Sequence, residues 1–530
     1  MKTSGNKSIV GFMGFWMFLA GLLLSGMPLP AGSFAQEKPE TEKTIIMGAS
    51  RELAPGEKDP YYCTYTLKVW EPLIENGQDG EPKPKLAVAW LPNSDYTEWT
   101  FKLRDGVSFH DGEKFDADAV VTNVKHWLDF PGSRKPSPFY TFDMKAVYPG
   151  FQKIEKLDAL TVKFHFEKPV STLPYYMTNF GSPMYSPRCF DGTQEGDFNG
   201  LPQGTGPFRL VEAVRGQHLV LERNENYWGQ KSGASRIRIN IIPDANTRFS
   251  ALKSEEIMGV LDLGGITPTL ARELAKDPRF HVASCTSSVP HFLSVNHKHF
   301  PLDDVRVRQA ISLAIDRDTI NESFFGGYCF PTANILSAAS PFSKKIPITH
   351  DLEKARKLVA EALEGKREKI DILIPSGMLA REPYKELAEY LQAVLADIGL
   401  DATITIMDTA AATEHRRSGR FDTVLHTSGM PNSEPFTVLE GRMYGTGSSN
   451  TVYGCGYYNK EAEALIDSIR NEPDMVKRRE VYNRLQDLAA EDLPAIPLLD
   501  GCWLTVNNVK LTGYGPERYG QTLETLRWVK

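Results

Sequence analysis

The chain has 530 residues, of which 41% are hydrophobic and 24% charged, and its formal net charge is −7 at pH 7. This composition is ordinary for a soluble globular protein, and the length exceeds what one hydrophobic core supports, so two or more domains are expected. The acidic balance argues against nucleic acid as a partner, because phosphate binding needs a basic face.

Residues 1–35 have the order of a secretory signal peptide. Two lysines precede an apolar stretch at 9–24, two prolines then break any helix, and Ser33–Ala35 places small residues before a cut at Gln36. The alternative is an uncleaved membrane anchor, but the apolar stretch is shorter than the roughly 20 residues that a bilayer span requires. No cysteine precedes Cys63, so none is available for lipid attachment near the cut. The sequence therefore predicts a free periplasmic protein.

The six cysteines are widely spaced and form no C-x-x-C motif, which supports neither a zinc knuckle nor a thioredoxin-type redox pair. An oxidising compartment permits disulfides, but the pairing stays open. The cysteines are Cys63, Cys189, Cys285, Cys329, Cys455 and Cys502.

The first half of the chain after the leader is predicted to be mostly β-structure with short helices. Alternating apolar and polar residues indicate half-buried strands, and apolar residues at helical spacing indicate helices. Asp116 is a candidate helix N-cap. The predicted elements are a buried strand at 44–50, a helix at 65–75, strands at 98–109 and 157–169, and a helix at 115–128.

The segment Gly204–Gly229 carries the most information. A Gly-Thr-Gly-Pro turn leads into a strand, a polar turn follows at Arg215–Gln217, and a returning strand ends in an Asn-Tyr-Trp-Gly cluster. This pattern closely resembles the signature of extracellular solute-binding proteins of the peptide/nickel type, which deliver ligands to ABC importers. The resemblance extends from Thr44 to Lys530, and the run Ile242–Arg248 is most similar to the nickel-binding branch.

The second half is predicted to alternate helices and strands, which is the mark of an α/β lobe with parallel strands. Extended chain at 280–296 and at 493–501 is predicted to cross between two lobes. The predicted helices begin near Asn246 or Thr247, cover 301–320 with Asp303 or Asp304 as cap, and cover 351–365 and 382–400; the predicted strands cover 369–375, 401–407 and 421–429.

The resemblance implies an α/β, two-lobed periplasmic-binding-protein fold of type II, of the large cluster with an extra subdomain in lobe I. Lobe I is expected to comprise 36–280 and 495–530, with the inserted subdomain at about 81–200, and lobe II to comprise 281–494. The protein is expected to be a monomer that closes its lobes on a small ligand, passes it to the transmembrane subunits of an ABC permease, and catalyses nothing.

Catalytic patterns are absent from the sequence. It contains no G-x-S-x-G elbow, H-E-x-x-H, P-loop or strand-linked G-x-G-x-x-G motif, so the alternative of a secreted hydrolase has no supporting motif. The triplet His110–Gly112 is better interpreted as a polar turn than as a catalytic pair. His297 and His299 resemble a metal pair, but they lie in a polar loop without further ligands nearby.

In the first lobe, the resemblance to nickel binders assigns Tyr61, Tyr62 and Cys63 to a loop that faces the cleft. It places Arg134 where those relatives carry a cleft arginine. A guanidinium suits the carboxylates of a metal chelator because it donates two parallel hydrogen bonds. A solvent-exposed loop arginine is the open alternative.

In the second lobe, the resemblance points to the strand and loop around His426 and Asn432. His426 is a candidate ligand contact or metal ligand, and a hydrogen-bonded wall histidine is the alternative. Arg442 and Tyr444 follow on the next element and are expected to close over an anionic group.

Two departures from the family pattern bear on the ligand. Peptide binders carry in this loop an acidic residue that pairs with the α-ammonium group of the peptide. Here Glu434 precedes Pro435, but the residues before it do not match that pattern, which weakens the peptide hypothesis. The cleft aromatic residues of nickel binders are replaced by Ser428, Gly429 and Ser433, and a second cleft arginine is replaced near Phe180. The predicted ligand is therefore nickel or another transition metal in an organic, metallophore-like chelate, carried as cargo and not as a cofactor; the alternative is an oligopeptide.

Overall fold

The structure is a computed structural model that divides the chain into two compact units, Met1–Pro39 and Glu40–Lys530. It describes residues 43–51, 66–129, 148–178, 182–190, 200–261, 264–379, 381–430 and 432–529. The predicted signal peptide lies outside the described residues. Among the described helices, none combines the length and apolar character that crossing a membrane would require.

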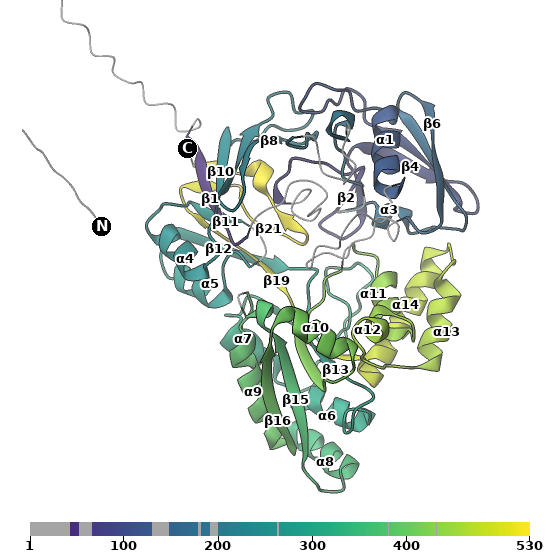
Figure 1. Cartoon of the computed structure of the whole chain (residues 1–530), viewed down its shortest axis with the longest axis vertical. Coiled ribbons are helices and arrows are strands. Elements are labelled where there is room, and N and C mark those ends of the chain that lie inside the picture. Colours follow the sequence, from purple (N-terminus) through teal and green to yellow (C-terminus); the bar gives the residue numbers. More distant parts are fainter. Residues whose placement is uncertain are drawn as a thin grey trace, which may run out of the picture. The chain divides into compact units, whose positions relative to one another are not determined.

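A seven-stranded sheet contains the amino-terminal strand of the described chain (Figure 1). Its strand order is β12-β19-β11-β1-β10-β9-β8, and β1 runs parallel to β10 and β11. Helices α4 and α5 pack against it through Leu252, Leu274 and their neighbours. The bounds are β1 Ile45–Ala49, β8 Phe208–Val214, β9 His218–Arg223, β10 Arg236–Ile241, β11 Gly259–Leu261, β12 Phe280–Thr286, β19 Cys502–Asn508, α4 Ala245–Lys253 and α5 Pro268–Leu274.

A four-stranded antiparallel sheet of order β4-β5-β7-β6 lies within the predicted inserted subdomain. Helix α1 covers it, and Asp116 accepts a hydrogen bond from the Ala119 N–H at 3.0 Å, which confirms the predicted N-cap. Phe101 and Phe164 meet edge to face in its core. The bounds are β4 Ala87–Pro92, β5 Glu98–Leu103, α1 Ala117–Asp129, β6 Phe151–Asp158 and β7 Thr161–Phe166.

A six-stranded sheet of order β14-β18-β13-β17-β15-β16 forms the core of the second half. Strand β15 runs parallel to β16 and β17, as predicted, whereas β13 and β18 run antiparallel to their neighbours. Helices α6 to α9 share one apolar core with this sheet. The bounds are β13 His291–Val295, α6 Val305–Ala314, α7 Arg317–Phe324, β14 Phe330–Pro331, α8 Leu352–Ala362, β15 Glu368–Pro375, α9 Tyr384–Asp397, β16 Leu400–Met407, β17 Thr423–Thr427 and β18 Ala495–Asp500.

A helical cluster, α11 to α14, packs beside this sheet around Phe292, Leu485 and Tyr482. The remaining elements are short pieces that join or edge the sheets. The bounds are β2 Ile74–Asn76, β3 Pro82–Pro84, α3 Leu173–Tyr176, α10 Thr409–Arg417, α11 Phe436–Met443, α12 Ser448–Thr451, α13 Lys460–Ile469, α14 Met475–Asp492, β20 Leu511–Thr512, β21 Pro516–Glu517, β22 Gly520–Gln521 and β23 Arg527–Trp528, with 3-10 turns at Pro187–Phe190, Ser376–Met378 and Leu523–Thr525.

Two connections carry the chain between the seven-stranded and six-stranded sheets, and both were predicted from extended sequence. The first joins β12 to β13, and the second joins β18 to β19 through Gly501. They touch, because the Ser287 N–H donates to the Gly501 carbonyl at 2.8 Å. A Cβ added to Gly501 would lie 2.1 Å from the Val289 carbonyl oxygen, so only glycine fits at this contact.

The predicted helix at 65–75 is wrong from Leu67 onward, since residues 67–73 form no helix and β2 begins at Ile74. Leu67, Val69 and Trp70 have no exposed surface. Their helical spacing therefore reflects burial on every side of an irregular segment and not one face of a helix. The Val69 carbonyl accepts a hydrogen bond from the Gly206 N–H at 2.9 Å instead of an intrahelical one.

Two helix boundaries also differ from the prediction. The stretch at 301–320 forms two helices, α6 and α7, because Ile315 and Asp316 are extended and Asp316 caps the second helix. Helix α4 begins after Asp244, whose carboxylate accepts the Thr247 N–H, and not at Asn246 or Thr247. The polar run Asp244–Thr247 contains several residues that could supply the capping oxygen, so the sequence alone did not fix where the helix begins.

Candidate ligand-binding site

The predicted site residues fall into two groups. Tyr61, Tyr62, Cys63 and Arg134 lie outside the described residues, as does Phe180. The other group lies in or next to β17 and α11 and comprises His426, Asn432, Arg442 and Tyr444.

His426 lies at the end of β17, where it faces Phe292 of β13 across the sheet. Its Nδ1 is 2.9 Å from the Thr427 carbonyl oxygen, so Nδ1–H donates there and Nε2 accepts from the Ser294 hydroxyl at 2.5 Å. Burial, together with the positive charges of Arg416 and Arg442, lowers the pKa of His426 to about 3. The ring is therefore neutral, with both nitrogens hydrogen-bonded to the protein, which favours the wall-histidine alternative.

Arg442 extends from α11 over the ring of Phe292, with its guanidinium carbon 3.9 Å from the ring centroid. The residue is 8% exposed. Burial lowers the pKa of Arg442 to about 10, so the side chain stays charged at neutral pH. Among the described residues, the structure gives this guanidinium no hydrogen bond and no carboxylate within ion-pair distance.

The free charge of Arg442 is costly. A buried charge without a partner is among the most destabilising features that a protein retains. The ring of Phe292 offsets only part of this cost, since a desolvated cation–π contact stabilises by about 2 kcal/mol. An unpaired cation next to a wall histidine is suited to hold an anionic group of a ligand.

A second buried arginine in this region was missed by the sequence analysis. Arg416, in the last turn of α10, is 8% exposed and lies 4.2 Å from the ring centroid of Tyr453. Its Nε has no hydrogen-bond partner. In the sequence it belongs to the basic run at 415–417, which is typical of a solvated helix end, so no local signal separated it from Arg417.

Asn432 and Tyr444 use their polar atoms in local structure. The Asn432 side-chain oxygen accepts the Glu434 N–H at 2.9 Å, and the Tyr444 hydroxyl donates to Asp467 on α13 at 3.2 Å. The structure thus brings His426 and Arg442 together on Phe292. Ligand contact by any of the four remains a prediction.

Glu434 does not provide a free carboxylate. It is 1% exposed and accepts hydrogen bonds from Arg478 at 3.1 Å, from the Phe436 N–H at 3.1 Å, and from the Tyr482 hydroxyl. Arg478 is itself buried, so the pair is an internal ion pair that joins the α11 loop to α14. The carboxylate of Glu434, the candidate counterpart of the acidic residue that binds the amine in peptide binders, is therefore already hydrogen-bonded within the protein.

The histidines considered for chemistry also have structural partners. His110 contacts the backbone at Gly204 and Gly206, and burial lowers its pKa to about 4. His297 donates to the Pro494 carbonyl, whereas His299 contacts Asp422. Within the described ranges, no cluster of three or more His, Cys, Asp or Glu side chains is arranged to hold a metal ion.

A small pocket opens beside the two connections between the sheets, and none of the predicted site residues that the structure describes lines it. Its polar lining includes His291, Cys329, Arg381, Glu382 and Cys502. Arg381 and Glu382 are neighbours in the loop before α9, but the other three come from separate elements, so no motif in the sequence could have grouped the set.

Comparison with known proteins decides the family. The sequence model described as bacterial extracellular solute-binding proteins, family 5 Middle, matches residues 81–450. The chain belongs to family 5 of the bacterial extracellular solute-binding proteins. Its signature segment Gly204–Gly229 lies within this match.

Individual family 5 relatives differ in ligand. The chain is 28% identical over 400 residues to the nickel-binding periplasmic protein of Escherichia coli K12, covering 70% of this chain and 72% of that protein. It is 26% identical over 470 residues to the glutathione-binding protein GsiB of Salmonella paratyphi A, covering 86% and 89%. These relatives are named for binding and not for catalysis.

Solved structures of family 5 proteins share the fold. NikA from Brucella suis, solved in complex with Fe(III)-EDTA, matches with a TM-score of 0.77 at 23% identity, covering 89% of this chain and 96% of that chain. The fold is thus the predicted α/β periplasmic-binding-protein fold. The exact lobe boundaries remain a prediction.

Proposed function

We propose that this family 5 protein is the periplasmic component of an ABC importer and captures nickel, or another transition metal, within an anionic organic chelate. After removal of residues 1–35, it works as a monomer that closes two lobes on the ligand, catalyses no reaction, and delivers the ligand to the permease. The proposal of an anionic ligand rests on Arg442, which is a buried cation without a counter-ion among the described residues.

The chemistry of a chelate fits this arrangement. Nickel prefers nitrogen and oxygen donors, and a chelator brings those donors itself, so the protein needs to recognise only the outer carboxylates. An arginine fork donates two parallel hydrogen bonds to a carboxylate. The neutral ring of His426 would line the same wall, and the buried ring of Phe292 would support Arg442 from behind. Arg134 and the Tyr61–Cys63 loop are proposed to approach from the other lobe.

An oligopeptide is the second candidate, and similarity to glutathione-binding proteins favours it. Peptide binding would require a carboxylate for the α-ammonium group. Glu434 is engaged by Arg478 and Tyr482, so this candidate needs a different anchor.

Isothermal titration of the purified mature protein separates the two candidates. The panel comprises Ni(II) with histidine, Ni(II)-EDTA, Ni(II) alone, glutathione, and mixed di- and tripeptides. We expect binding of at least one chelate and none of the peptides. Binding of peptides with no response to any chelate would refute the metal proposal.

The variant Arg442→Met tests whether the unpaired charge of Arg442 binds the ligand. Methionine keeps an apolar stem over Phe292 but removes the charge, and we expect chelate affinity to fall on the order of 30-fold, as for loss of a buried charge partner. Arg417→Met is the matched control, because Arg417 is exposed on α10 and pairs only with Glu414. Unchanged affinity in Arg442→Met would remove this residue from the site.

A further inference from the structure

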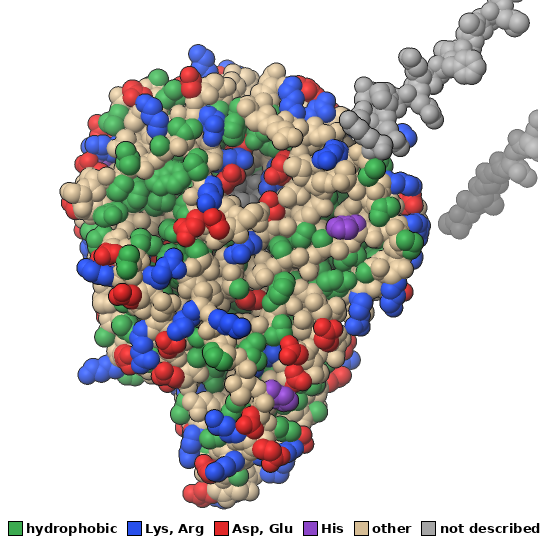
Figure 2. All heavy atoms as spheres, turned by 180° about the vertical axis from the view of Figure 1, so that it is seen from behind, with side chains coloured by type: hydrophobic (Ala, Val, Ile, Leu, Met, Phe, Trp, Pro, Cys, Tyr) green, Lys and Arg blue, Asp and Glu red, His purple; other side chains and the backbone are tan. Residues whose placement is uncertain are grey.

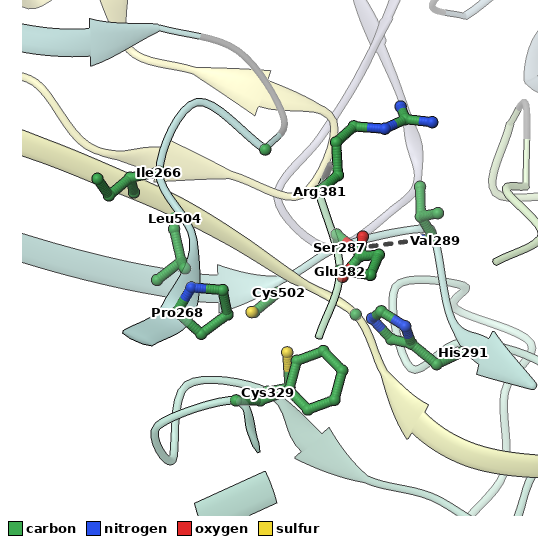
Figure 3. A pocket seen from close by; sticks show the side chains of 13 residues that line it. Ile266, Pro268, Ser287, Val289, His291, Cys329, Arg381, Glu382, Cys502 and Leu504 are labelled. Atoms are coloured by element: carbon green, nitrogen blue, oxygen red, sulfur yellow. Dashed lines mark hydrogen bonds between the residues drawn. The ribbon is translucent and has the colours of Figure 1, made fainter. Parts of the chain in front are cut away.

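The pocket beside the two inter-sheet connections brings two cysteines together (Figure 3). Cys329 directly precedes β14 of the six-stranded sheet, whereas Cys502 begins β19 of the seven-stranded sheet. Strand β14 pairs with β18 so that Phe330 lies opposite Asp500. This register places Cys329 next to the Gly501–Cys502 junction, where the chain passes between the sheets.

The two sulfur atoms face the same space. Figure 3 shows both thiols turned into the pocket that the two residues line together. Cys329 is 2% exposed, whereas Cys502 is half-buried. The two cysteines therefore line one pocket, and Cys502 is the member that keeps part of its surface exposed.

We propose that Cys329 and Cys502 are a modification site that forms a disulfide, joining the two sheets beside the place where the connections cross. The co-reactant is a low-molecular-weight or protein disulfide. That such an oxidant meets the protein in its own compartment rests on the proposed periplasmic function; the reactivity of the pair does not.

The reaction proceeds by two thiol–disulfide exchanges. The Cys502 thiolate attacks one sulfur of the oxidant, which forms a mixed disulfide and releases the first thiolate. The Cys329 thiolate then attacks the Cys502 sulfur, which forms the Cys329–Cys502 bond and releases the second. The two cysteines lose two electrons and two protons, the oxidant gains both electrons, and its two thiolates take up the protons.

Burial sets the order of these steps. Desolvation, followed by the contact with Cys502, raises the pKa of the Cys329 thiol well above its usual value. The thiolate is the nucleophile in exchange, so Cys329 is the poorer first attacker. It serves instead as the resolving thiol, because the Cys502 side chain faces the same pocket.

The bond would join segments that are distant in the chain and belong to different sheets. It would close a long loop and so restrict the unfolded chain more than a local disulfide does. It would also limit relative movement of the two sheets at the Ser287–Gly501 contact. We therefore expect the oxidised protein to unfold at a temperature several degrees higher than the reduced protein.

Peptide mapping tests the proposal on the full mature chain. The reduced protein is incubated with oxidised glutathione, denatured, alkylated and digested without reductant. We expect one linked peptide that joins Cys329 to Cys502 and disappears on reduction. In Cys329→Ser, we expect glutathione to stay attached to Cys502, whereas Cys189→Ser, at a buried cysteine in the first half, should leave the linked peptide unchanged.

Three outcomes overturn the proposal: alkylation of both cysteines in the oxidised wild type, glutathione retained on wild-type Cys502, or a link from Cys502 to Cys285 or Cys63. Cys285 is the nearest described competitor, because it lies on β12 beside the partner residue of Cys502. None of these outcomes depends on the ligand, so failure of the proposed function in the titration panel leaves this test intact.

Discussion

Glu71 and Arg442 are both buried charges, yet their surroundings are opposite. Glu71 is 3% exposed and accepts hydrogen bonds from the Thr205 hydroxyl at 2.8 Å, the Tyr227 hydroxyl at 2.7 Å and the Trp228 indole N–H at 2.8 Å. Lys85 adds an ion pair at 3.5 Å. Among the residues that the structure describes, Arg442 has only the face of Phe292.

This difference fits a structural role for the Glu71 region and the proposed ligand-binding role for the Arg442 region. Three of the four partners of Glu71 lie in or beside the signature segment Gly204–Gly229, so that segment closes a saturated internal network. Gly204 and Gly206 let it approach the 68–70 backbone, where an added Cβ would come within 2.1 Å and 2.3 Å of carbonyl oxygens. A buried charge whose hydrogen bonds are all made within the protein stabilises the fold, whereas a buried charge without such partners could still pair with a ligand.

On the face shown in Figure 2, acidic and basic side chains are interspersed. Exposed charges of this kind contribute little, with a median of about 0–1 kcal/mol per pair. The informative charges of this protein are therefore the few that are buried.

The largest expected effect on stability is at Glu71, whose carboxylate has several hydrogen-bond partners. Glu71→Ala leaves the donors of Thr205, Tyr227 and Trp228 without their acceptor and leaves Lys85 with Glu75 alone. We expect the free energy of unfolding to fall by about 4 kcal/mol in urea denaturation. Glu71→Gln, which retains one acceptor oxygen, should lose about half as much. Glu75→Ala is the control, because Glu75 is partly exposed and pairs only with Lys85; an equal loss there would contradict the network.

Asp500 gives an intermediate case, since one carboxylate oxygen accepts the Ala338 N–H at 3.0 Å and the other has no partner. Burial raises the pKa of Asp500 to about 6 from 3.8. The folded protein then binds the proton more tightly than the unfolded one, so this group favours folding below about pH 4 and loses that contribution as pH rises through 6.

Asp500→Asn removes this titration. We expect the variant to gain about 2 kcal/mol of stability relative to wild type at pH 8 and little at pH 4, as measured by urea denaturation across pH. A gain that is constant with pH would show that the buried carboxylate does not titrate as the structure indicates.

The smallest expected effect has the opposite sign to that at Glu71. Arg442→Met removes an unpaired buried charge, so we expect the ligand-free protein to gain about 1 kcal/mol, or to keep its stability, in thermal and urea denaturation. A loss of more than about 2 kcal/mol would place Arg442 with the structural charges, and the comparison with Glu71 would fail.

Much of the fold could be predicted from local sequence. The β8–β9 hairpin, the N-cap at Asp116, the alternation of helices and strands after 351 and both inter-sheet connections follow from periodicity and turn residues. The helix at 65–75 could not, because Leu67, Val69 and Trp70 are buried on all sides and their spacing carries no information about one face.

The candidate site was less predictable than the fold. The resemblance indicated the region of His426 and Arg442, but it gave no indication that Arg442 is unpaired or that Glu434 is engaged by Arg478. Arg416 was missed because its neighbours His415 and Arg417 make it look like a solvated helix end. Such assignments depend on partners that lie far away in the sequence.

The sequence by itself predicted a secretory leader and determined the family signature and most of the order of the elements, because these depend on residue types within one short window. Only the tertiary structure decided which buried charges have partners and which two of the cysteines meet. Glu71 and Trp228, or Cys329 and Cys502, are brought together by packing between separate sheets and segments. The physical reason is that desolvation, which sets the cost of a charge and the reactivity of a thiol, is a property of the whole surrounding and not of the chain nearby.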